Sequence, residues 1–265
     1  MTIQISKTEI NNIVNKINPN HMINIKQLVM FFGHAHSGHS IIGAIMDAHP
    51  DVCITNEINI AKLFKDHDVS KKELESILLY YSHDNDSQGA WHNTEYKYQI
   101  NSGFQGKTDT PMVIGDKKGG ASTRIIMNNP EILTKILDMY GNKVKFINVH
   151  RKPIDVIAAY AHYWKQPIGQ AHLTRFIEND QANLMIKSKV PTSQWLDIDQ
   201  KQFIEHPKTI IGQIFEFISV DYSKQQLEQW TSIVKANMVG KSSQMNIPVE
   251  LSKSLNSYIK KRGNT

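Results

Sequence analysis

A glycine-, serine- and histidine-rich segment, GHAHSGHS at residues 33–40, follows one of the most apolar stretches of the chain. Gly33 and Gly38 permit a tight backbone turn, and a helix that begins at such a turn directs its unpaired N–H groups toward it. Serine hydroxyls and helix N-terminal N–H groups together bind anions such as phosphate. The segment also holds three histidines in six residues, which is unusual for an ordinary strand-to-helix turn. The segment therefore predicts an anion-binding loop. The polar side chains of this loop belong to His34, His36, Ser37, His39 and Ser40.

Cations follow two other apolar stretches of the chain. Arg151 comes directly after INVH, and Lys117 and Lys118 come directly after VIGD and before two glycines. Taken singly, the arginine could pair at the surface with Asp155, and adjacent lysines usually line a solvated loop. Together with the loop at 33–40, the three cations predict a site for a ligand with several phosphate-type groups.

The elements that position these residues are short apolar strands that alternate with helices. The pattern predicts strands at 27–33, 51–55, 112–116, 143–150 and 194–198, and helices at 40–50, near 57–67 and 70–82, and at 154–164, 207–218, 223–236 and 248–261. This alternation indicates an α/β fold with a parallel sheet of about five strands flanked by helices on both faces. Ligands of such sheets bind at the carboxyl ends of the strands, where the loop and the three cations fall.

The composition is that of a globular protein, with 40% hydrophobic and 21% charged residues among 265. We expect a single domain over residues 1–265, with a polar lead-in of weak helical pattern at 1–26. A long excursion at 83–110, with a possible strand around 96–101, is the expected acceptor region because loops of this length are usually functional. Its residues Trp91, Tyr96, Tyr98, Phe104 and Gln105 either line a pocket or pack the excursion onto the domain.

Charge and cysteine usage narrow the function further. The net charge of +5 favours an anionic ligand, and no lysine/arginine block or aromatic-interleaved basic stripe indicates nucleic acid. A single cysteine, Cys53, excludes an intramolecular disulfide framework and a thiolate metal cluster. The polar N-terminus and the lack of a long apolar run predict a cytoplasmic protein with no membrane span.

The segments resemble the motifs of the PAPS-dependent sulfotransferase superfamily, PAPS being 3′-phosphoadenosine 5′-phosphosulfate. The run from FFGHAHSGHS to TNE (31–57) resembles the 5′-phosphosulfate loop, Gly-x-x-(Arg/Lys)-Ser-Gly-Thr-(Ser/Thr), and its helix. VHRKPIDVIAAYAHYW (149–164) resembles the 3′-phosphate signature, and GKSSQMNIPVELSKSL (240–255) the terminal segment that closes over the nucleotide. DAHPDV followed by a glutamate, and VIGDKKGG in place of a Lys-Asp-Pro segment, are most similar to the tyrosylprotein sulfotransferase branch.

The resemblance extends from residue 28 to the C-terminus and implies a P-loop NTPase-like three-layer fold. It implies transfer of a sulfuryl group from PAPS to a hydroxyl or amine, with adenosine 3′,5′-bisphosphate as product and no metal. Carried over by position, Ser37, Gly38, His39 and Ser40 bind the 5′-phosphosulfate and Arg151 binds the 3′-phosphate. Lys117 approaches the sulfuryl group or the acceptor, and Glu57 is the general base that takes the acceptor's proton. Glu57 could instead be only a neighbour of the N-terminus of the helix that follows it.

Three positions depart from the family pattern. His36 and His39 replace the loop cation and the loop threonine, and Ala159 replaces the serine eight residues after Arg151 (151 + 8 = 159). The serine's lost hydrogen bond to a charged group would cost about 1.5–3 kcal/mol, which Lys241, Ser242 or Ser243 could restore. We expect His36 to be protonated beside the phosphosulfate and to stabilise charge on the bridging oxygen as the S–O bond breaks.

Other functions compete with this interpretation. The three loop histidines could bind zinc or iron, although no carboxylate or cysteine ligands accompany them. An ATP-dependent kinase would need a lysine where His39 follows Gly38. A non-catalytic protein could retain the fold without turnover. The acceptor, which the sequence does not identify, is a small molecule or a glycan or lipid head group, and the oligomeric state is open.

Overall fold

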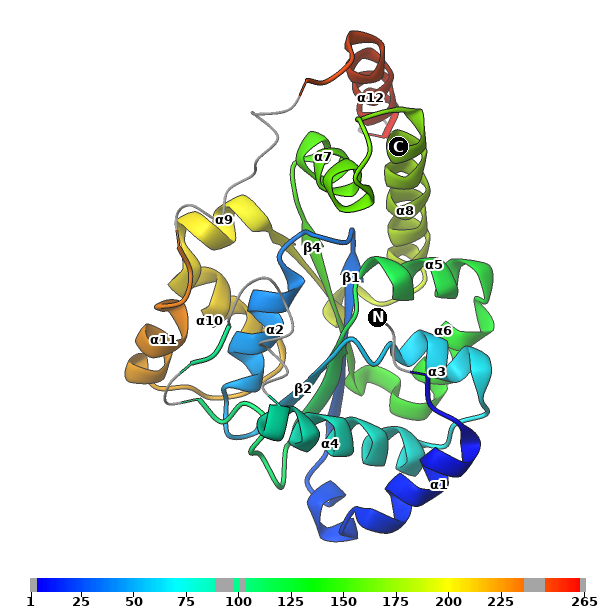
Figure 1. Ribbon diagram of the computed structural model, residues 1–265. Helices are drawn as coiled ribbons and strands as arrows, with labels where there is room; N and C mark the ends of the chain where they lie inside the picture. The colour runs from blue at the N-terminus through cyan, green and yellow to red at the C-terminus, as the bar shows by residue number, and fades with distance from the viewer. Residues whose placement is uncertain (1–3, 89–97, 101–102, 236–245, 263–265) are drawn as a thin grey trace.

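The sheet is the centre of the fold in the computed structural model, which describes residues 4–88, 98–100, 103–235 and 246–262. In the described part of the chain, five parallel strands pair in the order β2-β3-β1-β4-β5 (Figure 1). They are β1 (Gln27–Gly33), β2 (Val52–Asn56), β3 (Val113–Lys117), β4 (Val144–His150) and β5 (Trp195–Asp199). The predicted parallel α/β sheet of about five strands is confirmed.

The strands are apolar throughout because helices cover both faces of the sheet. Side chains alternate along β1, so that Leu28, Met30 and Phe32 enter the core on one face. Val29 and Phe31 enter a second core on the other face. A strand buried on both sides reads as a continuous hydrophobic run, which is why sequence alone locates it well.

The helices form one layer on each face and a third group above the carboxyl ends of the strands (Figure 1). The first layer holds α1 (Lys7–Lys16), α3 (Ile60–Asp66), α4 (Lys71–Gln88), α5 (Gly120–Asn128) and α6 (Glu131–Tyr140), together with the C-terminal part of α8 (Gln170–Ser188). The opposite layer holds α2 (His39–Asp47), α9 (Gln200–Glu205), α10 (Pro207–Phe217) and α11 (Lys224–Thr231). The third group is α7 (Pro153–Trp164), α12 (Val249–Arg262) and the N-terminal half of α8. Short 3₁₀ turns lie at η1 (Pro19–Met22), η3 (Gly141–Lys143) and η4 (Thr192–Gln194).

Four helices, α5, α6, α8 and α9, were not predicted from the sequence. The third predicted helix, expected at 70–82, is α4, which continues to Gln88 and therefore occupies the start of the expected excursion. The strand expected around 96–101 lies mostly outside the described residues, and residues 98–100 form no regular element. Among the described residues, no helix has both the length and the apolar composition that crossing a bilayer requires.

The lead-in at 1–26 contributes to the core through α1. Ser6 caps this helix, and its side chain accepts a hydrogen bond from the Glu9 N–H. Ile10 and Ile13 are buried in the same core cluster as the side chains of α4. The contribution of α1 to the core was not predicted from the sequence, because most of its residues are polar and only one narrow side of the helix is apolar.

Replacing Ile10 by alanine should therefore destabilise the whole protein. The loss of a fully buried isoleucine side chain costs about 2–5 kcal/mol, which urea unfolding followed by circular dichroism measures. Asn11→Ala, on the exposed side of the same helix, is the matched control and should change the unfolding free energy by less than about 0.5 kcal/mol. Equal, small effects of both substitutions would mean that α1 does not unfold together with the sheet.

Candidate active site

The loop between β1 and α2 has an unusual backbone. Three of its residues have left-handed φ values: Gly33 at +114°, His36 at +65° and Gly38 at +98°. At Gly33 a Cβ atom would lie 2.8 Å from the Val149 carbonyl oxygen, so no other residue fits there without a shift of β4. The strand can turn away at this point only because Gly33 has no side chain.

The loop contains polar groups that lack their usual side-chain partners. Gly38 caps α2, and no side chain hydrogen-bonds to the first N–H groups of this helix. The Ser37 hydroxyl is fully buried and has no hydrogen-bond partner within the described part of the chain. Free N–H groups at a helix N-terminus attract anions, and a buried hydroxyl without a partner is costly unless a ligand completes it.

The three loop histidines point into different surroundings. His39 donates from Nε2 to the Phe32 carbonyl oxygen at 2.6 Å, and burial lowers its pKa to about 3, so its ring is neutral. His34 stacks on the Phe176 ring at 4.5 Å, and its burial also lowers its pKa. His36 is exposed, with its ring centroid 5.1 Å from that of Tyr163. Among the residues that the structure describes, no group of three histidine, cysteine or carboxylate side chains could hold a metal.

A carboxylate with two lysines lies at the neighbouring strand ends. Glu57, directly after β2, forms ion pairs through its two carboxylate oxygens with Lys117 at the end of β3 and with Lys118. The Lys117 side chain is only 5% exposed, and burial lowers its pKa to about 8. The Glu57 side chain is 36% exposed and so remains open to solvent.

The turn that carries Glu57 is held in place by a buried aspartate. Glu57 and Asn59 have φ values of +73° and +66°, a conformation that costs a non-glycine residue about 1–2 kcal/mol. Asp116 of β3 accepts hydrogen bonds from the N–H groups of Ile58 at 2.9 Å and Asn59 at 2.7 Å. These bonds offset the backbone strain, which marks this turn as a functional candidate.

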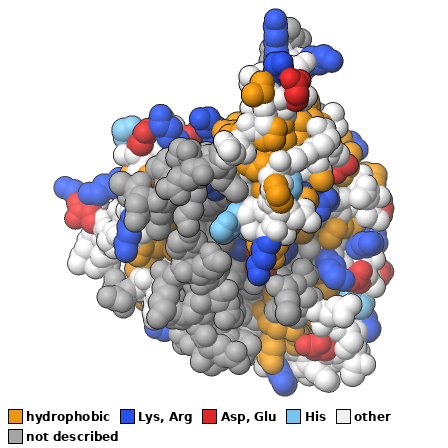
Figure 2. All heavy atoms as spheres, turned by 45° about the horizontal axis from the view of Figure 1, so that its top comes forward, with side chains coloured by type: hydrophobic (Ala, Val, Ile, Leu, Met, Phe, Trp, Pro, Cys, Tyr) orange, Lys and Arg blue, Asp and Glu red, His pale blue; other side chains and the backbone are white. Residues whose placement is uncertain are grey.

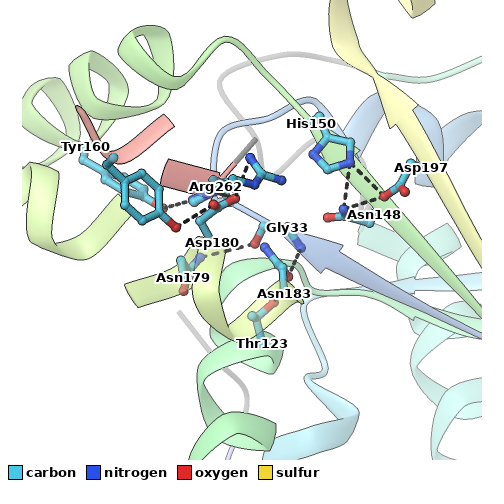
Figure 3. Close-up of polar contacts among 12 residues, drawn as sticks. Gly33, Thr123, Asn148, His150, Tyr160, Asn179, Asp180, Asn183, Asp197 and Arg262 are labelled. Carbon is cyan, nitrogen blue, oxygen red and sulfur yellow. Dashed lines mark hydrogen bonds and ion pairs between the residues drawn. The ribbon is translucent and has the colours of Figure 1, made fainter. Parts of the chain in front are cut away.

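Arg151 joins the end of β4 to the loop. Its Nη1 donates to the His36 carbonyl oxygen at 2.6 Å. The preceding residue, His150, instead pairs with Asp197 of β5 at 2.8 Å, beside Asn148 (Figure 3). Arg151 thus contacts the loop, whereas His150 belongs to a separate polar cluster with Asn148 and Asp197.

The structure brings the predicted loop, lysine and arginine residues to one edge of the sheet. Gly119 and Gly120, directly after Lys118, contact the loop so closely that a Cβ would lie 2.8 Å from His39 Cε1 and 3.1 Å from the Ala35 nitrogen, respectively. Ala159 is half-buried in the second turn of α7. Lys241, Ser242 and Ser243 lie outside the described residues.

The predicted acceptor region is described only in part. Trp91 and Tyr96 lie outside the described residues, and Phe104 is 45% exposed. Gln105 holds the backbone of the excursion, because its Nε2 donates to the carbonyl oxygens of Ala44 and Tyr98. Large apolar side chains are also exposed on α7 and α12, namely Tyr163, Trp164, Val249 and Ile259. Figure 2 shows apolar groups gathered on the upper part of one face of the molecule.

Two features of the site were not predicted. Asp116 stands in the VIGDKKGG run, but nothing in the sequence indicates that it organises the turn after β2. Lys118 was recognised as part of a basic pair, although its ion pair with Glu57 depends on a strand pairing, β2 with β3, that the sequence does not reveal.

Comparison with known proteins identifies the family. The model of a sulfotransferase family matches residues 29–224, which is 196 of the 265 residues (224 − 29 + 1). None of the curated proteins compared with the sequence matches it.

Solved structures share the fold. A sulfotransferase domain from the curacin biosynthetic pathway superposes with a TM-score of 0.60 at 12% identity, covering 91% of this chain and 98% of that domain. A sulfotransferase domain from the Synechococcus PCC 7002 olefin synthase gives 0.56 at 12% identity, over 98% of each chain. Mouse sulfotransferase SULT7A1, solved with PAP, gives 0.51 at 11% identity, over 97% of this chain and 89% of that one. The family match over most of the chain, on a fold shared with these structures, means that the protein belongs to the sulfotransferase family.

Proposed function

We propose that the protein transfers the sulfuryl group of PAPS to a hydroxyl or amine of an acceptor, with Glu57 as the general base. The observation that carries this proposal is the ion-paired group of Glu57, Lys117 and Lys118, held at the same sheet edge as a loop with uncapped N–H groups. A carboxylate beside cations and an anion-binding loop is what proton removal from an acceptor and stabilisation of a phosphosulfate both need.

The described residues fit a nucleotide with phosphate groups at both ends of its ribose. The uncapped start of α2, the buried Ser37 hydroxyl and the hydroxyl of Ser40 supply donors for a 5′-phosphosulfate. In this proposal His39 contributes only its backbone N–H, since its ring is bonded to Phe32. Arg151, which contacts the loop from β4, supplies the cation for a 3′-phosphate, and the PAP complex of mouse SULT7A1 supports such a ligand.

In the proposed reaction the acceptor oxygen or nitrogen bonds to sulfur, the bond from sulfur to the bridging phosphate oxygen breaks, and adenosine 3′,5′-bisphosphate leaves. Glu57 accepts the proton that the acceptor loses. The bound anion offers Lys117 and Lys118 a second negative partner, which weakens their hold on Glu57. His36, on the exposed side of the loop, is proposed to add positive charge near the leaving oxygen.

The remaining assignments concern the rim of the site. Ala159 of α7 takes the place where a serine would help bind the 3′-phosphate, and Lys241 and Ser242 are proposed to replace that contact. The acceptor is proposed to be a small molecule or a glycan or lipid head group, recognised by the excursion at 83–110. Exposed Tyr163, next to His36, gives the acceptor or the nucleotide an aromatic surface at this rim.

Calorimetric titration with adenosine 3′,5′-bisphosphate tests the nucleotide site directly. We expect micromolar binding by the native protein and much weaker binding of ATP and ADP. Arg151→Ala should lower the affinity for the bisphosphate at least about 30-fold, because it removes a charge-assisted contact worth roughly 2–3 kcal/mol. Lys208→Ala, an exposed change of equal charge on α10, is the control and should have no effect. No binding by the native protein would favour the non-catalytic alternative.

Glu57→Gln tests the role of Glu57 as general base separately from nucleotide binding. Removal of the carboxylate leaves both lysines to the nucleotide, so the bisphosphate should bind as tightly as in the native protein or several-fold tighter. Turnover of PAPS with any acceptor found by screening should fall by about 10²–10⁴-fold, the usual contribution of a general base. Unchanged turnover, or loss of nucleotide binding, would contradict the assignment of Glu57.

The lowered pKa of Lys117 predicts a pH dependence of nucleotide binding. With a pKa of about 8, the ammonium group loses its proton as the pH rises from 7.5 to 9.5, so affinity for the bisphosphate should fall several-fold over this range. Phosphate groups are already fully ionised there, since their second pKa is about 6. Lys117→Arg keeps its charge and should bind the bisphosphate with nearly constant affinity between these pH values. Equal pH profiles for both proteins would exclude Lys117 as the titrating group, with Lys118 as the next candidate.

A further inference from the structure

One side of α8 presses against the first two residues of the loop. Asn179, Asn183 and Phe176 lie three or four positions apart and so share one side of this helix, which Asp180 borders. All four side chains are at least 94% buried. Phe176 and Asp180 contact His34, whereas the two asparagines contact the backbone of Gly33 (Figure 3).

The two asparagines bind both polar backbone groups of Gly33. The Gly33 N–H donates to Asn183 Oδ1 at 3.1 Å, and Asn179 Nδ2 donates to the Gly33 carbonyl oxygen at 3.3 Å. Gly33 is the residue at which β1 turns into the loop, with its φ of +114°. The side chains therefore hold the two peptide groups on either side of the Gly33 Cα, where the chain turns from β1 into the loop.

Partners on α5 hold each asparagine in this orientation. The Thr123 hydroxyl donates to Asn183 Oδ1 at 3.1 Å, and Arg124 Nη1 donates to Asn179 Oδ1 at 3.3 Å. The second contact requires that Nδ2 of Asn179 faces Gly33, since only the amide oxygen can accept from arginine. The orientation of the amide is thereby set by its two neighbours.

Burying the two amides costs free energy, because each must form hydrogen bonds that offset its desolvation. Apolar side chains would pack in the same places without this cost. An anion-binding loop gains from such support: donors that are already fixed lose little conformational entropy when the ligand binds. We propose that Asn179 and Asn183 are positioning residues that fix the loop in its anion-binding conformation. This inference rests on the proposed function, since it concerns the nucleotide site of that reaction.

Asn183→Leu removes the acceptor for the Gly33 N–H and keeps the branching of the side chain at Cγ. Gln194→Leu is the matched control: it is also a buried amide that binds backbone, donating to the carbonyl oxygens of Gly141 and Val144 at the opposite end of the sheet. Both substitutions should lower the urea midpoint. Only Asn183→Leu should weaken the binding of adenosine 3′,5′-bisphosphate, by at least tenfold in calorimetry. The affinity of Gln194→Leu should stay within twofold of that of the native protein. Equal affinities in the two variants would overturn the proposal.

Hydrogen exchange at the Gly33 amide gives a second measurement that needs no nucleotide. Phe32–Gly33 is the only Phe-Gly pair in the sequence, so carbonyl-¹³C phenylalanine with ¹⁵N glycine labels this one amide for NMR. We expect slow exchange in the native protein and in Gln194→Leu, and at least tenfold faster exchange in Asn183→Leu. Unchanged exchange would overturn the role of Asn183.

The two measurements distinguish the failure of this inference from that of the proposed function. If the native protein does not bind the bisphosphate but Asn183→Leu speeds exchange, the proposed function fails while the asparagine still fixes the loop. If the bisphosphate binds and neither affinity nor exchange changes, only the positioning role fails. If Asn183→Leu does not fold, Asn179→Ala removes the donor to the Gly33 carbonyl and should weaken the bisphosphate several-fold; native affinity in that variant would overturn the proposal.

Discussion

The site depends on the close approach of three backbone segments at the carboxyl edge of the sheet. β1 ends at Gly33 against the carbonyl oxygen of Val149 in β4, and the segment after β3 crosses the loop at Gly119 and Gly120. A Cβ at any of these glycines would lie 2.8–3.1 Å from the nearest atoms of the loop, of β4 or of α8, closer than carbon atoms normally approach. This crowding admits only glycine at position 33, where a φ of +114° turns the chain into the loop that leads to the start of α2.

The electrostatic properties of the same sheet edge depend on charged side chains that are largely buried. Lys117 is buried among apolar strands and stays near its partners, Asp116 on one side and Glu57 on the other. Asp116 is itself buried, which raises its pKa to about 6, and it uses its oxygens to hold the turn after β2. The geometry of Glu57 is thus set by a carboxylate that holds the turn after β2, and its charge is balanced by Lys117 at the end of β3 and by Lys118, the next residue.

Much of the fold could be predicted because the strands are apolar on both sides. The runs at 27–33 and 143–150 coincide with β1 and β4 to within a residue, and the order of glycine loop, lysines and arginine along the chain indicated the family. α8 escaped prediction because its buried side carries Asn179, Asp180 and Asn183, so its pattern is not that of an amphipathic helix. The separate surroundings of the three histidines could not be predicted either, since they depend on Phe32, Phe176 and Tyr163, which come from different elements.

The crowding around Gly33 also has a consequence for folding. The residues that shape the loop, at positions 33, 119, 149 and 183, are far apart in the chain, and they meet only when β1, β3, β4 and α8 have docked. A contact set of such high sequence separation forms late and cooperatively. The loop is therefore not a local motif that a peptide of β1 and α2 could reproduce. Its conformation is acquired together with the complete sheet, so that a chain which has not finished folding does not yet hold the N–H groups at the start of α2 in place.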